Sequence, residues 1–321
     1  MRIQRQLLPK ILRGLHNNGH DFGKNSEKMS QFSNPVVVLI IAHKPDLAWY
    51  EKMSLEQCYR VLGNHPIRLV CPEGLDLAAY RAIVPGIQAD FIPRHWLESL
   101  RAYNRLKILP WLYRRYAKFD YMLTYELDAL VFRDELLHWC AQGWDYIGAP
   151  WFKNHKDDTS EGFWAVGNSG FSLRRVSTCL KVLRSRRLLA SPIELGRSSS
   201  LFPGSPGLGF LVRILKTALC ACGYRNTMRY FATHFTEYED IFWSFHAKRA
   251  VPGFKIPTPQ EALRFSFEFA PRYCFEKNGL RLPFGCHAWH KTDPAFWREM
   301  LTTQVELSGS ISADCGKCSA T

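Results

Sequence analysis

NPVVVLIIAHK, residues 34 to 44, contains six consecutive aliphatic residues, bounded by Pro35 and by the polar His43 and Lys44. The apolar run is continuous and does not alternate with polar residues. This pattern is typical of a strand buried on both faces, as in a parallel sheet covered by helices. We therefore expect a central strand here, where the fold begins.

Helical and strand-like segments alternate after this strand. The spacing predicts a helix over 47–62, then strands at IRLVCP (67–72) and near ADFIP (89–93). A basic helical segment over 99–119 precedes DYMLTYELDALVF (120–132). This alternation predicts an α/β fold with a mostly parallel sheet flanked by helices. In such sheets ligands bind beyond the C-terminal ends of the strands.

The composition is that of a folded protein. With 321 residues, 46% of them apolar and 14% aromatic, the chain can bury a sizeable core. We expect one domain over 35–305, between a basic N-terminal segment (1–34) and a tail (306–321). No apolar run reaches the roughly 20 residues of a membrane-spanning helix, and the N-terminus lacks the apolar core of a secretory signal. These features predict a cytoplasmic protein.

The ten cysteines are scattered through the sequence and predict free thiols. The one C-x-x-C pair, Cys315 and Cys318, lies in a Ser/Gly-rich stretch with no histidine nearby. A zinc site is one interpretation of this pair, and an unstructured tail is the favoured one.

Positive charge is concentrated in three segments of a chain whose formal net charge is +13. Residues 1–28 carry +4, and residues 101–118 and 174–197 carry +6 each. Such clustering indicates an anionic partner: nucleotide phosphates, an acidic glycan or lipid, or nucleic acid. The alternative is that the arginines only solvate helix faces. The amphipathic N-terminal segment fits a peripheral position on the inner face of an anionic membrane, with a frayed terminus as the alternative.

Two carboxylates stand in an otherwise apolar stretch, YELDALVF (125–132). Glu126 and Asp128 are two residues apart, so on an extended strand their side chains point the same way. Hard divalent ions prefer oxygen ligands of this kind, together with substrate phosphates. An E-x-D triplet is common by chance, and a solvated strand end is its ordinary interpretation.

Glycines flank a short polar loop in VGNSGF (166–171). Gly167 and Gly170 surround Asn168 and Ser169, and they permit a close approach of backbone N–H groups to a ligand. An ordinary turn explains the motif equally well. Its spacing is not that of a P-loop or a dinucleotide-binding fold, which argues against a kinase or a dehydrogenase.

Acids and histidines recur later in the chain. Glu239 and Asp240 stand where a helix is expected to begin, a place that the helix dipole favours for acids. A carboxylate there is also a candidate general base for a sugar hydroxyl. His287 and His290 are candidate metal or phosphate ligands, or are packed among neighbouring aromatic residues.

The order of these motifs resembles that of the GT-A class of nucleotide-sugar glycosyltransferases. The blocks YELDALVF, WDYIGAPW, VGNSGFSLR, EDIFWS and PFGCHAW are together similar to a bacterial and fungal domain family of unknown function that is regarded as GT-A-like. They extend from about Val36 to Trp297.

The resemblance implies a single GT-A-like domain with a Mn²⁺ or Mg²⁺ site. Asp128 would be the metal-binding acid of the D-x-D motif, Glu126 would take its first position, and His287 would be a metal or phosphate contact. Glutamate replaces aspartate at position 126, which leaves strict metal dependence open.

The implied reaction moves a sugar from a nucleotide-sugar donor to a glycan or lipid-linked acceptor, as in bacterial surface polysaccharide synthesis. Asp240, with Glu239 beside it, would supply the base if the reaction inverts configuration. The expected donor-binding residues are Asn104, Arg105, Lys107, Gly167, Asn168, Ser169 and Gly170. Arg174 is a further candidate for a positive group, and Trp151 and Trp164 are candidates for stacking on a sugar.

A second hypothesis is a non-catalytic GT-A-like protein that binds an acidic glycan or lipid through its basic helices. No nucleic-acid partner is expected, because no recognition motif accompanies the positive charge.

Overall fold

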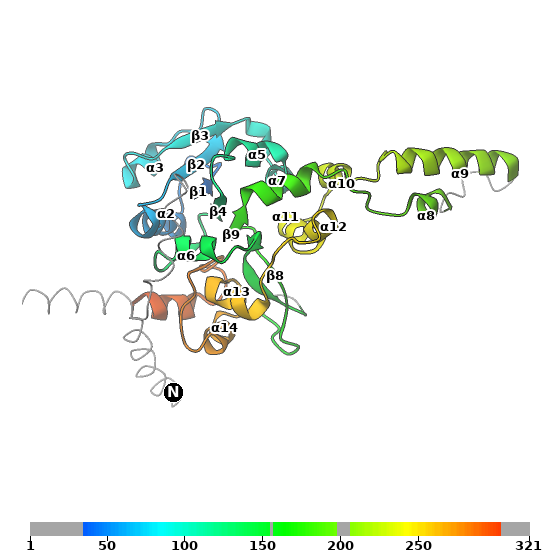
Figure 1. The fold of residues 1–321 in the computed structure, drawn as a ribbon. Helices are drawn as coiled ribbons and strands as arrows, with labels where there is room; N and C mark the ends of the chain where they lie inside the picture. Colours follow the sequence, from blue (N-terminus) through cyan, green and yellow to red (C-terminus); the bar gives the residue numbers. More distant parts are fainter. Residues whose placement is uncertain (1–34, 155–156, 198–205, 303–321) are drawn as a thin grey trace, which may run out of the picture.

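The computed structural model describes residues 35–154, 157–197 and 206–302, and Figure 1 shows its fold. The predicted segments 1–34 and 306–321, with Cys315 and Cys318, lie outside these ranges. A six-stranded sheet has the order β3-β2-β1-β4-β9-β6. Its strands are β1 (Val36–Ile41), β2 (Ile67–Pro72), β3 (Ala89–Ile92), β4 (Tyr121–Tyr125), β6 (Tyr146–Ile147) and β9 (Phe171–Arg175). The four strands from β3 to β4 are parallel, and β9 runs antiparallel to β4 and β6.

Strand β1 is buried on both faces, as its continuous apolar sequence predicts. Val36, Val38 and Ile40 belong to one hydrophobic cluster, and Val37, Leu39 and Ile41 belong to the cluster on the other face. Because successive strand residues point to opposite faces, each face must be covered by helices. The predicted α/β class is confirmed.

Helices cover both faces of this sheet (Figure 1). The cluster around Val38 includes residues of α2 (Trp49–Leu62), α3 (Ala78–Ile83) and α6 (Leu136–Ala141). The cluster around Leu39 includes residues of η2 (Arg94–Leu97), α4 (Leu100–Leu106), α5 (Pro110–Arg115), α7 (Val176–Arg184), α10 (Met228–His234), η3 (Phe242–His246) and α12 (Ala247–Ala250). The short helix α11 (Glu239–Ile241) leads directly into η3, which is a π-helix.

The C-terminal part of the chain forms a third hydrophobic cluster. It contains a three-stranded sheet of β10 (Ser266–Phe267), β11 (Gly285–Cys286) and β5 (Leu130–Val131), and the hairpin of β7 (Ala149–Phe152) and β8 (Phe163–Gly167). The helices α13 (Pro259–Phe265) and α14 (Pro271–Lys277), and a helix from residue 294, complete it. Because β5 pairs with β11, this layer is attached to the chain just after β4.

Two predicted elements are divided in the structure. The basic helical segment forms α4 and α5, because Leu109 is extended before Pro110, which begins the second helix. YELDALVF is not one strand: β4 ends at Tyr125 and β5 begins at Leu130 in another sheet. A turn joins them, in which the N–H of Ala129 donates to the carbonyl of Glu126 at 2.9 Å.

A helical hairpin extends away from the body (Figure 1), formed by α8 (Pro192–Arg197) and α9 (Pro206–Ala221). The sequence predicts a surface loop over 197–209. Residues 198–205 lie outside the described ranges, but Arg197 ends α8 and 206–209 form the first turn of α9, so the prediction is wrong at both ends. Proline is favoured in a first helical turn, where its missing N–H costs nothing. In the described part of the chain, no helix has the length and apolar character needed to cross a bilayer.

Candidate functional site

The candidate site lies at the C-terminal end of β4, beside the end of β1. The N–H of Glu126 donates to the carbonyl of Gly170 at 2.7 Å, which joins the acid triplet to the glycine loop before β9. A cavity of about 450 Å³ opens here. The segments from Ile41 to Lys44 and from Leu97 to Leu100, with Glu126 and Asp128, contribute to its wall. This is the sheet edge at which α/β proteins bind ligands.

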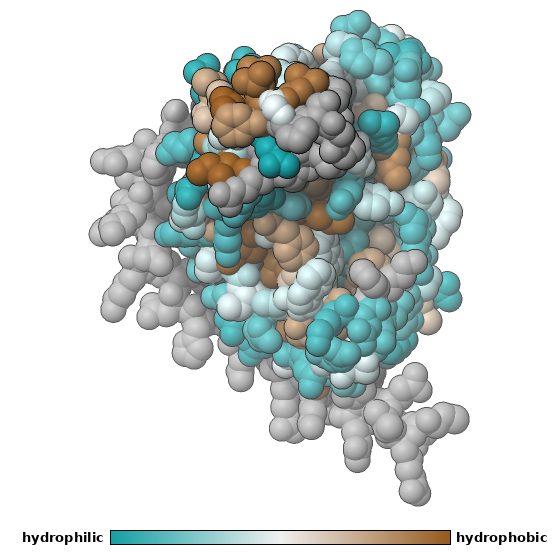
Figure 2. Space-filling view, turned by 90° about the vertical axis from the view of Figure 1, so that its right-hand side faces the viewer, coloured by the Kyte–Doolittle hydropathy of each residue, from teal (hydrophilic) through white to brown (hydrophobic). Residues whose placement is uncertain are grey.

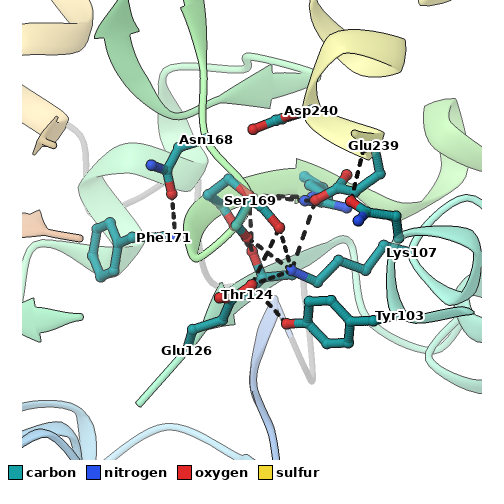
Figure 3. A network of polar contacts seen from close by, with 12 residues as sticks. Tyr103, Lys107, Thr124, Glu126, Asn168, Ser169, Phe171, Glu239 and Asp240 are labelled. Atoms are coloured by element: carbon teal, nitrogen blue, oxygen red, sulfur yellow. Dashed lines mark hydrogen bonds and ion pairs between the residues drawn. The ribbon is translucent and has the colours of Figure 1, made fainter. Parts of the chain in front are cut away.

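Glu126 is held by three donors (Figure 3). Its Oε1 accepts hydrogen bonds from the hydroxyl of Tyr103 at 2.6 Å, from Nζ of Lys107 at 2.5 Å and from the hydroxyl of Ser169 at 3.2 Å. Its second oxygen, Oε2, lies 3.7 Å from Nε2 of His287. One oxygen is therefore occupied within the protein, while the other faces His287 and Asp128.

Asp128 and His287 complete a cluster of possible metal ligands. Nε2 of His287 lies 3.0 Å from Oδ1 of Asp128, and Nδ1 lies 3.0 Å from a carboxylate oxygen of Glu268. Lys291 donates to Oδ2 of Asp128 at 2.9 Å. The predicted ligands Glu126, Asp128 and His287 are thus brought together, each with one ligand atom within 4.8 Å of the others.

This donor set fits a divalent cation. Nε2 of His287 is buried and, among the described residues, has no hydrogen-bond partner of good geometry, although it faces two carboxylates. Glu268 contacts the other ring nitrogen, as carboxylates do behind many histidine ligands. Two oxygens and one imidazole nitrogen suit Mn²⁺, and carboxylates also suit Mg²⁺.

The pKa shifts of the three residues also indicate that the cluster favours a bound positive charge. Burial raises the pKa of Asp128, but the neighbouring His287 and Lys291 outweigh burial and bring it to about 2. Burial opposes charging of Glu126 as well, yet Lys107 and His287 hold its pKa well below the ordinary value. Burial lowers the pKa of His287, and the surrounding carboxylates raise it well above its usual range. The cluster therefore favours a cation, either the proton on His287 or a metal ion.

The two glycines of VGNSGF are required by close packing. A Cβ atom at Gly170 would lie 2.1 Å from Nε2 of His287, and one at Gly167 would lie 2.3 Å from the ring of Trp151. Between them, the side-chain oxygen of Asn168 accepts the N–H of Phe171 at 2.7 Å. The loop therefore supports His287 directly, which the sequence alone does not show.

A buried network of charges lies behind the loop (Figure 3). Lys107 and Glu239 are both fully buried, with Nζ 3.7 Å from Oε1 of the glutamate. The same oxygen accepts from the guanidinium of Arg174 at 2.8 Å. The side chain of Asn104 accepts the N–H of Glu239 at 3.1 Å and caps α11. Glu239 is thus an internal counter-ion for two cations.

Asp240 differs from its neighbour Glu239. Its carboxyl group points toward the space beside Asn168 and Ser169 (Figure 3), and it accepts the N–H of Ile241 at 2.9 Å. Burial, the charge of Glu239 and the charge of Glu268 raise the pKa of Asp240 to about 7. A carboxyl group with this pKa can exchange a proton near neutral pH.

Other predicted residues lie away from the acid cluster. The guanidinium of Arg105 donates to the carbonyl of Thr233 in α10. His290 stacks on Tyr50, with ring centroids 3.7 Å apart. Trp164 is 54% exposed and stacks on Phe245, which also lies near Trp151.

Sequence reasoning did not single out three residues that contact the cluster. Tyr103 stands in the basic helical segment, one turn from Lys107, and Lys291 follows the HAWH segment, so both had a local signal. Glu268 directly follows the two-residue strand β10, and no pattern in its surroundings marks it.

The contact between Gly170 and His287 can be tested with Gly170→Ala. Because the added methyl group would meet the imidazole, we expect His287 to shift and Mn²⁺ affinity to fall roughly tenfold or more. Gly86→Ala is the matched control, since nothing lies within 4 Å of a Cβ there. Calorimetric titration with Mn²⁺ measures the difference, and equal affinities for the two variants would refute this role of Gly170.

The raised pKa of Asp240 predicts a pH-dependent cost in stability. Its value of about 7 in the folded state lies above the ordinary value near 4, so stability is lost as pH rises from about 4 to about 7. Asp240→Asn should therefore unfold at higher urea concentration than the wild type at pH 8, with little difference at pH 4.5. Asp46→Asn, at an exposed position, is the control. A variant less stable than the wild type at pH 8 would contradict the expectation.

Comparisons of the chain with curated proteins, solved structures and family models give different results. A search of the curated proteins finds no match. Similar solved structures include the galactosyltransferase LgtC with donor and acceptor sugar analogues (14% identity, TM-score 0.41, 85% of this chain and 95% of that chain). They also include mouse xyloside xylosyltransferase 1 in its apo form (11%, 0.38, 79% and 97%) and the bifunctional glycosyltransferase WbbM in its apo form (13%, 0.40, 82% and 47%).

The comparison with family models gives one match, over residues 86–287. The matched region contains Glu126, Asp128 and Asp240, and it ends at His287. It spans more than half of the chain, and we conclude that the chain belongs to the family described as "Protein of unknown function (DUF5672)".

Proposed function

We propose that this protein is a glycosyltransferase that moves a sugar from a nucleotide-sugar donor to a hydroxyl of a glycan or lipid-linked acceptor, with Mn²⁺ or Mg²⁺ on the diphosphate. The observation that carries the proposal is the convergence of Glu126, Asp128 and His287 at the C-terminal edge of the parallel sheet, where Glu126 and Asp128 line the cavity of about 450 Å³. A nucleotide-sized ligand fits a cavity of this volume.

The leaving group explains why such a site suits this reaction. Breaking the bond from the sugar to a nucleoside diphosphate leaves negative charge on the phosphates. A divalent ion held by Glu126, Asp128 and His287 would offset that charge electrostatically. Lys44 and Lys291 also line the cavity and add positive charge near the phosphates.

The protein's own residues have separate parts in the proposed reaction. Lys107 and Tyr103 fix the carboxylate of Glu126, so that its free oxygen stays directed at the site. Asp240 takes the proton from the acceptor hydroxyl, for which a pKa of about 7 is suitable. The hydroxyl of Ser169 accepts from Lys107 and donates to Glu126, and so it holds the glycine loop beside the site.

Metal-dependent nucleotide binding is the first test of the proposal. Asp128→Asn removes one ligand charge, so we expect affinity for UDP or GDP in the presence of Mn²⁺ to fall roughly tenfold or more. Asp134→Asn is the control, because that carboxylate pairs with His65 at the surface. Calorimetric titration of both variants, with and without Mn²⁺, measures the effect. Equal affinity in Asp128→Asn and the wild type would count against the proposed site.

The pH dependence of turnover tests Asp240. A base must be deprotonated to act, so donor hydrolysis or transfer should rise between pH 6 and pH 8 with an apparent pKa near 7. Asp240→Asn should lose roughly 100-fold or more in rate and retain Mn²⁺-dependent nucleotide binding. Released nucleotide is measured across a panel of nucleotide sugars. Nucleotide binding without turnover of any donor would instead favour a non-catalytic binding protein.

A further inference from the structure

The hairpin of α8 and α9 is joined firmly to the body at its base. The side chain of Asn226 pairs with the backbone of Ala190, accepting its N–H at 3.1 Å and donating to its carbonyl at 3.0 Å. Leu188 and Thr227 form a β-bridge beside this pair. The hairpin therefore extends from an anchored base (Figure 1).

Helix α9 packs against α8 and carries an apolar face that is about half exposed. Large side chains on it are 41% to 62% exposed, and we call these residues the α9 face: Leu208, Phe210, Leu211, Ile214, Leu215 and Leu219. At 100° per residue these six residues cover about half of the helix circumference, over a length of roughly 17 Å. Figure 2, which views the molecule from the side toward which the hairpin extends, shows hydrophobic residues gathered there.

The segment that carries this face is strongly basic. Residues 181–236 contain nine Lys and Arg and a single acid, Glu194, so they hold a formal +8 of the chain's +13. Exposed cations stand on the hairpin and at its base, namely Arg184, Arg186, Arg187, Arg213, Arg225 and Arg229. None of these six forms an ion pair with another residue of the described ranges.

We propose that the α9 face binds the surface of a bilayer that contains anionic lipids. A helix with a wide apolar face and basic residues around it inserts that face at the boundary of headgroups and acyl chains. The unpaired arginines complement the negative surface potential of such a membrane. A second copy of this chain is a poorer partner, because it would bring two segments of +8 together.

This inference goes beyond the proposed transferase function and does not depend on it. Membrane binding is measured without donor, acceptor or metal, so either proposal can fail while the other stands. If both hold, the protein acts at a membrane surface.

The full-length protein is mixed with vesicles of phosphatidylcholine alone or with about one third phosphatidylglycerol, and bound protein is sedimented. We expect binding to the anionic vesicles, weakened by salt, and slower amide hydrogen exchange in residues 206–221 when they are present. The triple variant Phe210→Ser, Leu211→Ser and Leu215→Ser should bind roughly tenfold or more weakly. Thermal unfolding checks that this variant is folded.

The control variant is Met53→Ser with Phe91→Ser, which alters exposed apolar residues of α2 and β3 and should bind as the wild type does. The exchange measurement separates the hairpin from every other lipid-binding part of the chain. Vesicle binding without protection of 206–221, or unchanged binding by the triple variant, would overturn the proposal. So would protection of 206–221 that appears without lipid as protein concentration rises, since the face would then join two copies.

Discussion

The ammonium group of Lys107 is fully buried, and the candidate site is built around its need for partners. A buried cation without partners costs several kcal/mol, so its hydrogen bonds constrain whatever supplies them. Nζ donates to Glu126 at 2.5 Å and to the hydroxyl of Ser169 at 2.6 Å, and it lies 3.7 Å from Glu239. The side chain of Lys107, the residue that directly follows α4, thereby joins the end of β4, the glycine loop and the start of α11.

Glu239 and Asp240, the two acids near this lysine, have different charged neighbours. The carboxylate of Glu239 forms ion pairs with Lys107 and Arg174, so its charge is neutralised within the protein. Asp240 has no ion-pair partner among the described residues, and its burial together with the nearby charge of Glu239 raises its pKa to about 7. The two adjacent acids thus have different surroundings: Glu239 is paired with two cations, whereas the carboxyl group of Asp240 can exchange a proton near neutral pH.

The sequence was sufficient to predict those strands and helices whose residue pattern repeats along the element itself. The run VVVLII predicts a doubly buried strand, and IRLVCP coincides with β2. The acid pair was also singled out, because its flanking residues are apolar and because the order of the later motifs resembles that of GT-A glycosyltransferases. Its turn was not predicted, since the division of YELDALVF between two sheets depends on β5 pairing with β11, more than 150 residues later.

Other features could not be predicted because their partners are distant in sequence. Tyr103 and Lys107 occur in a basic helical segment whose charge suggests a solvated surface, whereas both contact Glu126. Glu268 has a role in the site only because the fold brings its carboxylate next to the imidazole of His287. Helix α9 is apolar enough to suggest a core, and only the fold shows that its face is exposed.

The contacts that hold Asp240 in position do not stabilise the negative charge of its buried carboxyl group. Asn104 caps the N–H of the preceding residue, and the hydroxyl of Ser244 lies 2.7 Å from the carbonyls of both Asp240 and Val166. Ser244 belongs to the π-helix η3, a rare conformation that is frequent at functional sites. Since these contacts involve the backbone and not the carboxyl group, they fix Asp240 beside the glycine loop while its pKa stays high. At neutral pH and above, the buried charge of Asp240 lowers the stability of the folded protein, and the raised pKa that causes this loss is also what the proposed proton transfer from an acceptor hydroxyl requires.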